Sequence, residues 1–213
     1  MAVICPAITA EDADSYNQQV HKAASVSKRL HIDLMNGSMT PNSSVGIRDI
    51  WWPHHVKADI HLMYDRPEDV FDELVRLKPH MVILQNESSV HHMYFAARLH
   101  SLGIKAGLSI LQSTPIEWAQ QIMHSFDQVL IFSGNLGYHG GSADLELLSK
   151  VRFVREVHPE AEIAWDGGVN SSNVKQLVEG GVNVLDIGGF LMNDPDIKDA
   201  YGKIKKSLEK HQK

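Results

Sequence analysis

The feature that most constrains the fold is a regular alternation of short apolar runs with longer helical patterns along the whole chain. The apolar runs have the length and β-branched content of buried strands, and each is followed by a segment with helical spacing of its apolar residues. Parallel strands require helical crossovers, and eight such units fit within the chain. The pattern therefore predicts an α/β fold, a single (β/α)₈ TIM barrel over residues 1–213, with a doubly wound open sheet as the alternative.

The expected strands are Val3–Ile8, Leu30–Met35, Val56–Met63, Met81–Leu84, Ala106–Leu111, Gln128–Phe132, Glu162–Trp165 and Val182–Ile187. The expected helices are Glu11–Lys28, a short one at Ile47–Trp52, Arg66–Leu77, Ser88–Leu102, Thr114–His124, Ser142–His158, Ser171–Glu179 and Ile197–Lys210. Residues with known preferences for helix ends support several of the expected helix boundaries. Thr9 and the Ser88–Ser89 pair are candidate caps, Pro67 and Pro115 suit a first helical turn, and Gly103 suits a helix end.

Composition narrows the class of protein. The 213 residues are 43% hydrophobic, enough for one sizeable core, and the single Cys5 excludes an internal disulfide framework. A net charge of −6 gives no reason to expect nucleic acid as a partner. The sequence has neither a transmembrane-length apolar run nor the pattern of a secretory signal, so we expect no membrane association and a cytoplasmic location. Exposed barrel faces make a homo-oligomer the expected assembly.

One expected strand carries two side chains that can bind a metal. His31 and Asp33 are one residue apart, so the pleat places them on the same face of the strand, while Ile32 and Leu34 face the other way. Both lie near the carboxyl end of that strand. The loops at this end of the strands form the active site in barrels of this type.

Two further segments supply similar groups. His61 lies near the end of the third expected strand, and Asp166 stands just before the Gly167–Gly168 pair after the seventh. Taken singly, each residue is more often a hydrogen-bonded core residue or a turn former than a metal ligand. Together, two imidazoles and two carboxylates at one barrel mouth predict a site for one divalent metal: zinc, iron(II), manganese or cobalt.

Glycines follow the last three strands, where loops of such barrels commonly bind phosphate. Backbone amides can approach an anion closely at glycine, although any single pair is more simply explained as a turn. The glycines expected to bind phosphate are Gly137, Gly140, Gly141, Gly167, Gly168, Gly188 and Gly189.

These motifs resemble those of the ribulose-phosphate 3-epimerases. His-Ile-Asp-Leu-Met-Asn-Gly at 31–37, with Pro-Asn at 41–42, is similar to the family's His-Val-Asp-Val-Met-Asp-Gly and Pro-Asn. Asp-Ile-His-Leu-Met at 59–63 and Asp-Gly-Gly-Val-Asn at 166–170 resemble the family's Asp-Val-His-Leu-Met and Asp-Gly-Gly-Ile-Asn. The loop at 133–141 resembles its Ser-Val-Asn-Pro-Gly-Phe-Gly-Gly-Gln, and the likeness keeps its order and spacing over nearly the whole chain.

The resemblance implies a metal-dependent isomerase that interconverts D-ribulose 5-phosphate and D-xylulose 5-phosphate through an enediolate. It implies that His31, Asp33, His61 and Asp166 are the metal ligands and that Asp33 and Asp166 are also the catalytic acid and base. It places His61 with the glycines around the phosphorylated ketose. The pocket walls it implies are Met35, Met63, Gln85 and Phe132.

Several positions depart from the family pattern around this site. The departures are Asn36, Gln85, Phe132, Leu136, Trp165 and Gly189, and Thr9 is the nearest candidate for a first-strand serine. None removes an expected metal ligand, but several are expected to reshape the pocket. Gln85 and Phe132 are therefore candidate specificity positions.

Two alternatives remain open at the level of sequence. The substrate could be another 2-ketose phosphate, such as allulose 6-phosphate, whose 3-epimerase has similar motifs. The chain could also be a non-catalytic sugar-phosphate-binding homologue, which would not need a tightly held metal. Related decarboxylases and aldol enzymes place a lysine two residues after a strand aspartate, and neither Asp33 nor Asp166 has one.

Overall fold

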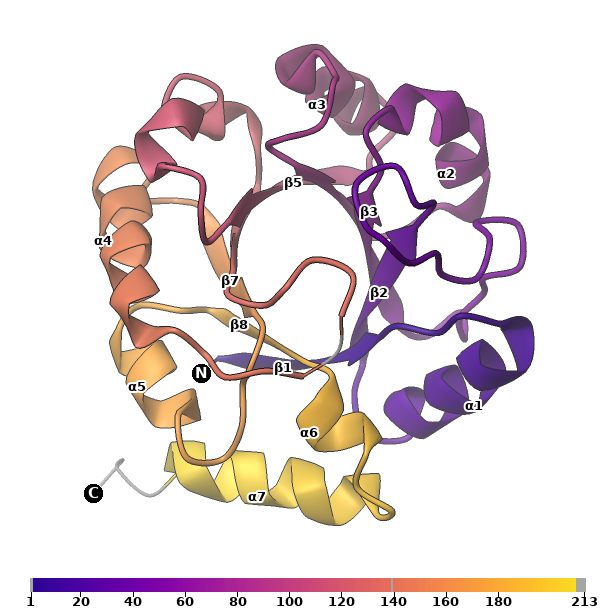
Figure 1. The fold of residues 1–213 in the computed structure, drawn as a ribbon, viewed down its shortest axis with the longest axis vertical. Helices are drawn as coiled ribbons and strands as arrows, with labels where there is room; N and C mark the ends of the chain where they lie inside the picture. Colours follow the sequence, from indigo (N-terminus) through magenta and orange to yellow (C-terminus); the bar gives the residue numbers. More distant parts are fainter. Residues whose placement is uncertain (1, 139, 210–213) are drawn as a thin grey trace.

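Eight parallel strands form a closed barrel in the computed structural model, which describes residues 2–138 and 140–209 (Figure 1). They pair in chain order, and β1 closes the ring against β8. The strands are β1 Val3–Ile8, β2 Arg29–Met35, β3 Lys57–Met63, β4 Met81–Gln85, β5 Lys105–Leu111, β6 Gln128–Phe132, β7 Glu162–Asp166 and β8 Val184–Ile187. The predicted (β/α)₈ barrel is confirmed, and the open doubly wound sheet is wrong.

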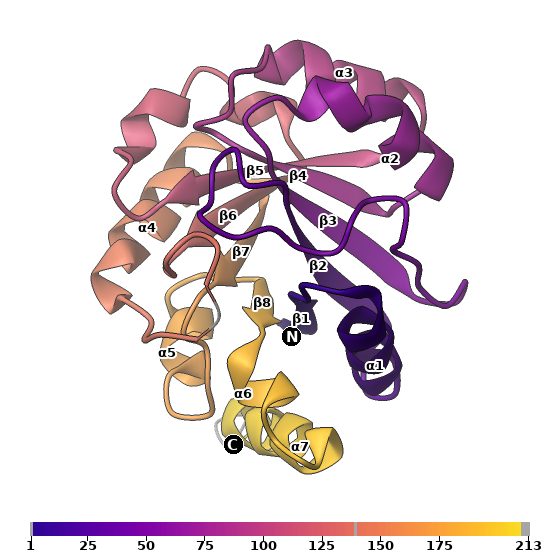
Figure 2. The same cartoon turned by 45° about the vertical axis from the view of Figure 1, so that its right-hand side comes forward.

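Helices surround the barrel and follow the strands. The α-helices are α1 Ala13–Ala24, α2 Phe71–Leu77, α3 His92–Ser101, α4 Leu148–Val157, α5 Val174–Glu179, α6 Gly189–Met192 and α7 Ile197–Glu209. The 3₁₀ turns are η1 Pro67–Val70, η2 Ile116–Ala119, η3 Met123–Ser125 and η4 Leu145–Leu147. After β8, α6 packs against β1 and α1, so the end of the chain completes the layer beside its beginning (Figure 2). The expected last residue of the final helix, Lys210, lies outside the described residues.

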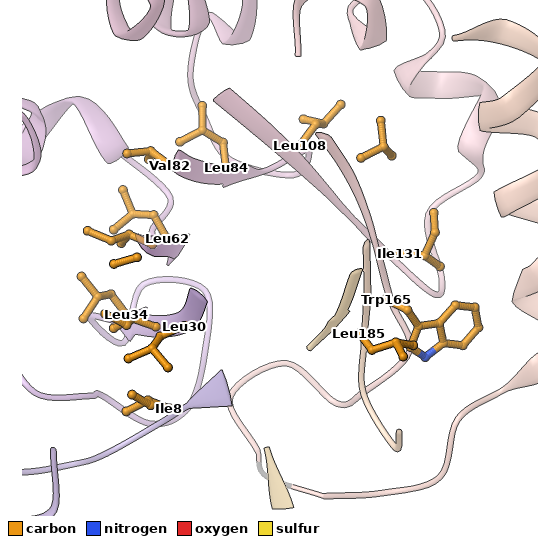
Figure 3. Close-up of a cluster of buried hydrophobic side chains, with 14 of the residues drawn as sticks. Ile8, Leu30, Leu34, Leu62, Val82, Leu84, Leu108, Ile131, Trp165 and Leu185 are labelled. Atoms are coloured by element: carbon orange, nitrogen blue, oxygen red, sulfur yellow. The ribbon is translucent and has the colours of Figure 1, made fainter. Parts of the chain in front are cut away.

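The alternation of side chains along the strands produces two apolar layers. Outward-facing residues such as Leu30, Leu62 and Leu108 lie between the strands and the helices (Figure 3). Trp165 belongs to this outer layer and is fully buried there, so it is not one of the departures that can reshape the pocket. A smaller cluster fills the barrel interior. Its members are Cys5, Met81, Ile83, Leu130, Phe132, Ala164 and Val184.

Two predicted helices are absent as such. Residues 47–49 form only a turn, and Tyr16 Oη donates a hydrogen bond to the carbonyl of Trp51 (2.8 Å), which ties the following extended segment to α1. The expected helix Thr114–His124 is instead the two short turns η2 and η3. A 3₁₀ turn brings residues three apart, such as Ile116 and Ala119, onto one buried side.

The expected caps also differ from those observed. Ser88 and Ser89 donate to the carbonyl of Tyr64 (2.7 Å) and the carboxylate of Asp65 (2.6 Å), so neither caps α3. Helix α1 is capped by Asp12, which accepts from the backbone N–H of Ser15 at 2.9 Å. Within residues 2–138 and 140–209, no helix is both long and apolar enough to cross a membrane.

Candidate active site

Strands β2 and β3 bring three polar side chains into the barrel. The inward-facing residues of β2 include His31 and Asp33, and Asp33 lies in register with His61 of β3. Leu34 on β2 and Leu62 on β3 point outward into the core, which locks this register. The i, i+2 spacing therefore explains why all three polar groups face one interior.

The four residues predicted to bind metal meet at one point. One ligand atom from each of His31, Asp33, His61 and Asp166 lies within 4.8 Å of all the others, and all four residues are buried. Nε2 of His31 is 3.2 Å from Oδ1 of Asp33 and 3.9 Å from Oδ2 of Asp166. Nδ1 of His61 is 3.0 Å from the same Asp33 oxygen.

The side chains at this point fit a divalent cation. Two imidazole nitrogens and two carboxylate oxygens are a donor set suited to a borderline metal. Asp33, Asp166 and a third carboxylate, Asp186, are all buried here, and no described residue lining the cavity is Lys or Arg. Three buried carboxylates that have only histidines as possible cationic partners are costly, and a metal ion would relieve that cost.

Sequence reasoning missed Asp186. It lies on β8 in register with Asp166 of β7, it is buried, and its Oδ2 is 3.4 Å from Nδ1 of His31. The signal was available, because a charged residue interrupts an otherwise apolar strand, Val-Leu-Asp-Ile. Thr9 also reaches the site and donates from Oγ1 to Oδ2 of Asp33 at 2.6 Å.

Gln85 lies behind His61 rather than in the cavity. Its Nε2 is 2.8 Å from Nε2 of His61, and it is fully buried and absent from the cavity lining. We expected it to be a pocket wall, and the structure shows that it contacts the site through His61. If Nδ1 of His61 were to hold a metal, the ring proton would be on Nε2, and the side-chain amide of Gln85 would need to present its oxygen there in place of its nitrogen.

The ionisable groups of the site differ in their proton affinity. Burial would raise the pKa of Asp33, but His31 and His61 outweigh it and hold that pKa well below the usual range. Burial and the neighbouring Asp33 charge raise the pKa of Asp166 well above normal. Burial raises the pKa of Asp186 to about 6. The site thus pairs two carboxyls whose pKa values are shifted in opposite directions.

A cavity of about 300 Å³ opens at this end of the barrel, beside Asp33 and Asp166. Met35, Met63 and Phe132 line it, and the Phe132 ring centroid is 5.9 Å from that of His61. All seven glycines predicted to bind phosphate also line it: Gly137, Gly140, Gly141, Gly167, Gly168, Gly188 and Gly189. Sequence reasoning did not identify Tyr138, Asn170, Phe190 and Asn193, which belong to the same lining.

The loop after β6 crosses the barrel opening (Figure 1). It reaches the loop after β2, where Asn42 Nδ2 donates to the carbonyl of Gly137 at 2.9 Å. Gly167 and Gly168 have φ of +108° and +68°, and a Cβ on either would overlap backbone atoms of this β6 loop. Glycine is therefore required at both positions for the two loops to pack. His139 of the same loop lies outside the described residues.

Comparison with known proteins identifies the family. A model of the ribulose-phosphate 3 epimerase family matches residues 3–192. The ribulose-phosphate 3-epimerase of Synechocystis is 27% identical, with 96% of this chain and 94% of that protein covered. The enzyme of the same name from Schizosaccharomyces pombe is 26% identical, with 99% and 96% covered.

Solved structures share the fold at lower identity. The chain is similar to 3-hexulose-6-phosphate synthase from Salmonella typhimurium, with a TM-score of 0.74, 14% identity and coverage of 97% of this chain and 98% of that one. It is also similar to phosphoribosyl anthranilate isomerase from Thermotoga maritima, with a TM-score of 0.68, 13% identity and 98% of each chain covered. These likenesses concern the barrel alone. The family match over residues 3–192, with the motifs that carry it converging at one barrel mouth, shows that the chain belongs to the ribulose-phosphate 3-epimerase family and is an isomerase acting on carbohydrates.

Proposed function

We propose that the protein is a metal-dependent 3-epimerase of a 2-ketose phosphate, with D-ribulose 5-phosphate and D-xylulose 5-phosphate as the first substrates to test. The observation that carries the proposal is the convergence of His31, Asp33, His61 and Asp166 beside a cavity lined by glycine loops. The named relatives are ribulose-phosphate 3-epimerases, which supports the same pair of substrates.

Asp33 and Asp166 suit the two proton transfers of an epimerisation. Inversion at a carbon next to a ketone requires a base that removes its proton on one face and an acid that returns a proton on the other. The pKa of Asp33 is held low and that of Asp166 is raised, so the two carboxyls differ in proton affinity, as an acid and base pair requires. They come from β2 and β7, which are separated in the ring by β1 and β8.

His31, Asp33, His61 and Asp166 would hold the divalent metal. Such an ion supplies electrostatic stabilisation of the negative charge that an enediolate carries. Thr9 donates a hydrogen bond to Oδ2 of Asp33, the oxygen that does not contact the histidines, and this bond fixes the orientation of the carboxylate.

The glycine loops after β6, β7 and β8 suit the phosphate of the substrate. No described residue of the lining is Lys or Arg, so an anion there would rely on backbone amides and on polar side chains such as Asn193. The positive φ of Gly167 and Gly168 turns their backbone at the cavity edge. We propose that these loops bind the phosphate, while the ketose carbons lie over Met35 and Met63.

Proton exchange at C3 tests the proposal. In D₂O, the metal-loaded enzyme should incorporate solvent deuterium at C3 of D-ribulose 5-phosphate while it forms D-xylulose 5-phosphate. A panel that includes allulose 6-phosphate, with exchange followed by NMR, identifies the preferred ketose. Metal-stripped protein is the control and should show little exchange until metal is restored.

Two outcomes would contradict the proposal. Metal-loaded protein that binds ketose phosphates without exchange would favour the non-catalytic binding homologue. Full activity in protein shown by elemental analysis to be metal-free would remove the metal from the scheme.

A further inference from the structure

Asp186 and His31 face each other inside the barrel. Oδ2 of Asp186 is 3.4 Å from Nδ1 of His31, while Nε2, on the other side of the same ring, is 3.2 Å from Asp33. Both residues are buried. Among the described residues, neither Asp186 oxygen nor His31 Nδ1 has a hydrogen-bond partner. A carboxylate and a ring nitrogen, both buried and both without another partner, are therefore aimed at each other.

We propose that Asp186 is a positioning residue for the metal site: it accepts the Nδ1–H of His31 and so directs the Nε2 lone pair toward the ion. The inference rests on the proposed function, because it concerns the same site. A histidine metal ligand commonly donates its second ring N–H to a carboxylate or carbonyl, which fixes the tautomer and strengthens the ligand.

The surroundings of Asp186 leave His31 as its best donor. Cys5 is its register partner on β1, and a thiol is only a weak donor. The Arg29 guanidinium is already engaged at the other end of the barrel, by Asp59 at 2.5 Å and Glu162 at 2.7 Å. The separation of 3.4 Å exceeds an ordinary hydrogen bond, so we expect a small rotation of the His31 ring to close it when metal binds.

The two histidine ligands then differ in their support. His31 faces a carboxylate, whereas His61 contacts the neutral amide of Gln85. A charged acceptor makes an imidazole a stronger ligand than a neutral one does. Loss of Asp186 should therefore weaken metal binding more than loss of Gln85.

Metal affinity of two variants tests this assignment. Asp186→Leu removes the acceptor and keeps the same number of side-chain heavy atoms and the same branching, and Asp186→Asn keeps a carbonyl oxygen but loses the charge. Zinc and cobalt(II) affinities are measured by competition with a chelator on metal-stripped protein, and thermal unfolding is recorded for each metal-free variant. We expect Asp186→Leu to bind metal about 10- to 100-fold more weakly than wild type, with Asp186→Asn in between.

Two controls separate positioning from a structural effect. Asp59→Asn alters a buried carboxylate at the opposite end of the barrel, where it pairs with Arg29 and His80, and should leave metal affinity unchanged. ¹⁵N NMR of the zinc-loaded wild type should show His31 protonated at Nδ1, a readout that needs no variant. Thermal unfolding of metal-free Asp186→Leu shows that the variant is folded before its metal affinity is compared with that of the wild type.

Unchanged metal affinity in Asp186→Leu, or a zinc-loaded His31 protonated at Nε2, would overturn the assignment while leaving the metal site intact. A lower stability of the metal-free variant without a change in metal affinity would also overturn it, in favour of a structural role. Wild type that binds no divalent metal would instead contradict the proposed function itself.

Discussion

The two ends of the barrel interior both hold buried charges, but they balance them differently. At the base, Arg29 donates from Nε to Asp59 at 2.5 Å and from Nη1 and Nη2 to Glu162 at 2.8 and 2.7 Å. His80 lies 2.8 Å from the second oxygen of Asp59. The base network, which we define as Arg29, Asp59, His80 and Glu162, is therefore satisfied by the chain itself.

The mouth has an excess of negative charge. Asp33, Asp166 and Asp186 converge there with two histidines, and no described lining residue is Lys or Arg. The same strands supply both ends: Arg29 and Asp33 are both on β2, four residues apart. The difference shows that burial of charge is not the signature of the site. Its signature is buried carboxylates that outnumber the cationic partners the protein provides.

The largest expected difference between the ends is in catalysis. Asp33→Asn and Asp166→Asn should each reduce epimerisation by about 10²- to 10⁴-fold or more, because each removes a proton-transfer group and a metal ligand. Asp166→Asn should not lower the stability of the metal-free protein, because burial and the Asp33 charge already disfavour its ionised form. Asp33→Asn should lower that stability, because it removes a carboxylate whose charge His31 and His61 stabilise. Rates with ketose phosphates and urea unfolding are the measurements, and full activity in either variant would exclude the two-carboxylate scheme.

The base network should show the opposite behaviour. Arg29→Met leaves the buried Asp59 and the half-buried Glu162 without their cation, and should lower the free energy of unfolding by about 3–5 kcal/mol. The activity per folded molecule should remain close to wild type, since no member of the network lines the cavity. Urea unfolding and steady-state kinetics test this, and a stable but inactive variant would mean that the two ends are coupled.

The pH dependence of stability should also separate the ends in metal-free protein. Burial would lower the pKa of His31, but Asp186 and Asp33 outweigh it and raise that pKa from 6.5 to about 10. The stability this contributes is fully present below pH 6.5 and is lost as the pH rises through 10. We expect a loss of ~1.4 kcal/mol per pH unit in this window.

Added metal should flatten the decrease in stability between pH 6.5 and 10, because the metal replaces the His31 proton. The His31→Gln variant should show the same flattening without metal.

At the base, burial would raise the pKa of Glu162, but Arg29 outweighs it and lowers that pKa below 4.5. The Glu162 contribution is present above pH 4.5 and is lost as the pH falls. Urea unfolding between pH 4 and 10 records the His31 and Glu162 contributions. Equal stability of the metal-free protein at pH 7 and pH 9 would contradict the prediction for His31.

The smallest effect should come from the departures beside the mouth. Phe132 lines the cavity, so Phe132→Met should change the relative rates on pentulose and hexulose phosphates by about tenfold. Gln85 contacts the site only through His61, so Gln85→His should alter metal affinity and leave the preference unchanged. Relative rates across a panel of ketose phosphates test this. A changed substrate preference in Gln85→His, or an unchanged one in Phe132→Met, would contradict the prediction.

Most of the barrel was predictable because its strands obey a simple rule. The i, i+2 spacing fixed which residues of β2 and β3 face inward, and eight strand patterns implied a closed ring. The helix after β5 was predicted wrongly because apolar spacing at Ile116, Ala119 and Met123 fits both a helix and two 3₁₀ turns. Lys150 of α4, which is far from this segment in the sequence, donates to the carbonyls of Leu111 (2.7 Å) and Gln112 (2.9 Å). These contacts hold the loop after β5 in place.

The site was less completely predictable. Motifs identified residues that sit beside glycines or in pairs, such as Asp166 and His31. Asp186 lies alone on a short apolar strand, and its importance depends on which nitrogen of His31 it faces, which only the three-dimensional packing determines. Trp165 is the opposite case: it was counted among the departures around the site because it precedes Asp166, but its side chain faces the helices.

The most direct test of the account is the location of a bound ion. Crystals soaked with manganese or cobalt should show one anomalous peak at the barrel mouth, bound by Nε2 of His31, Nδ1 of His61 and the carboxylates of Asp33 and Asp166. The base network should show none. A barrel mouth without an anomalous peak, or an ion held by other residues, would contradict the claim that the mouth is built around a metal.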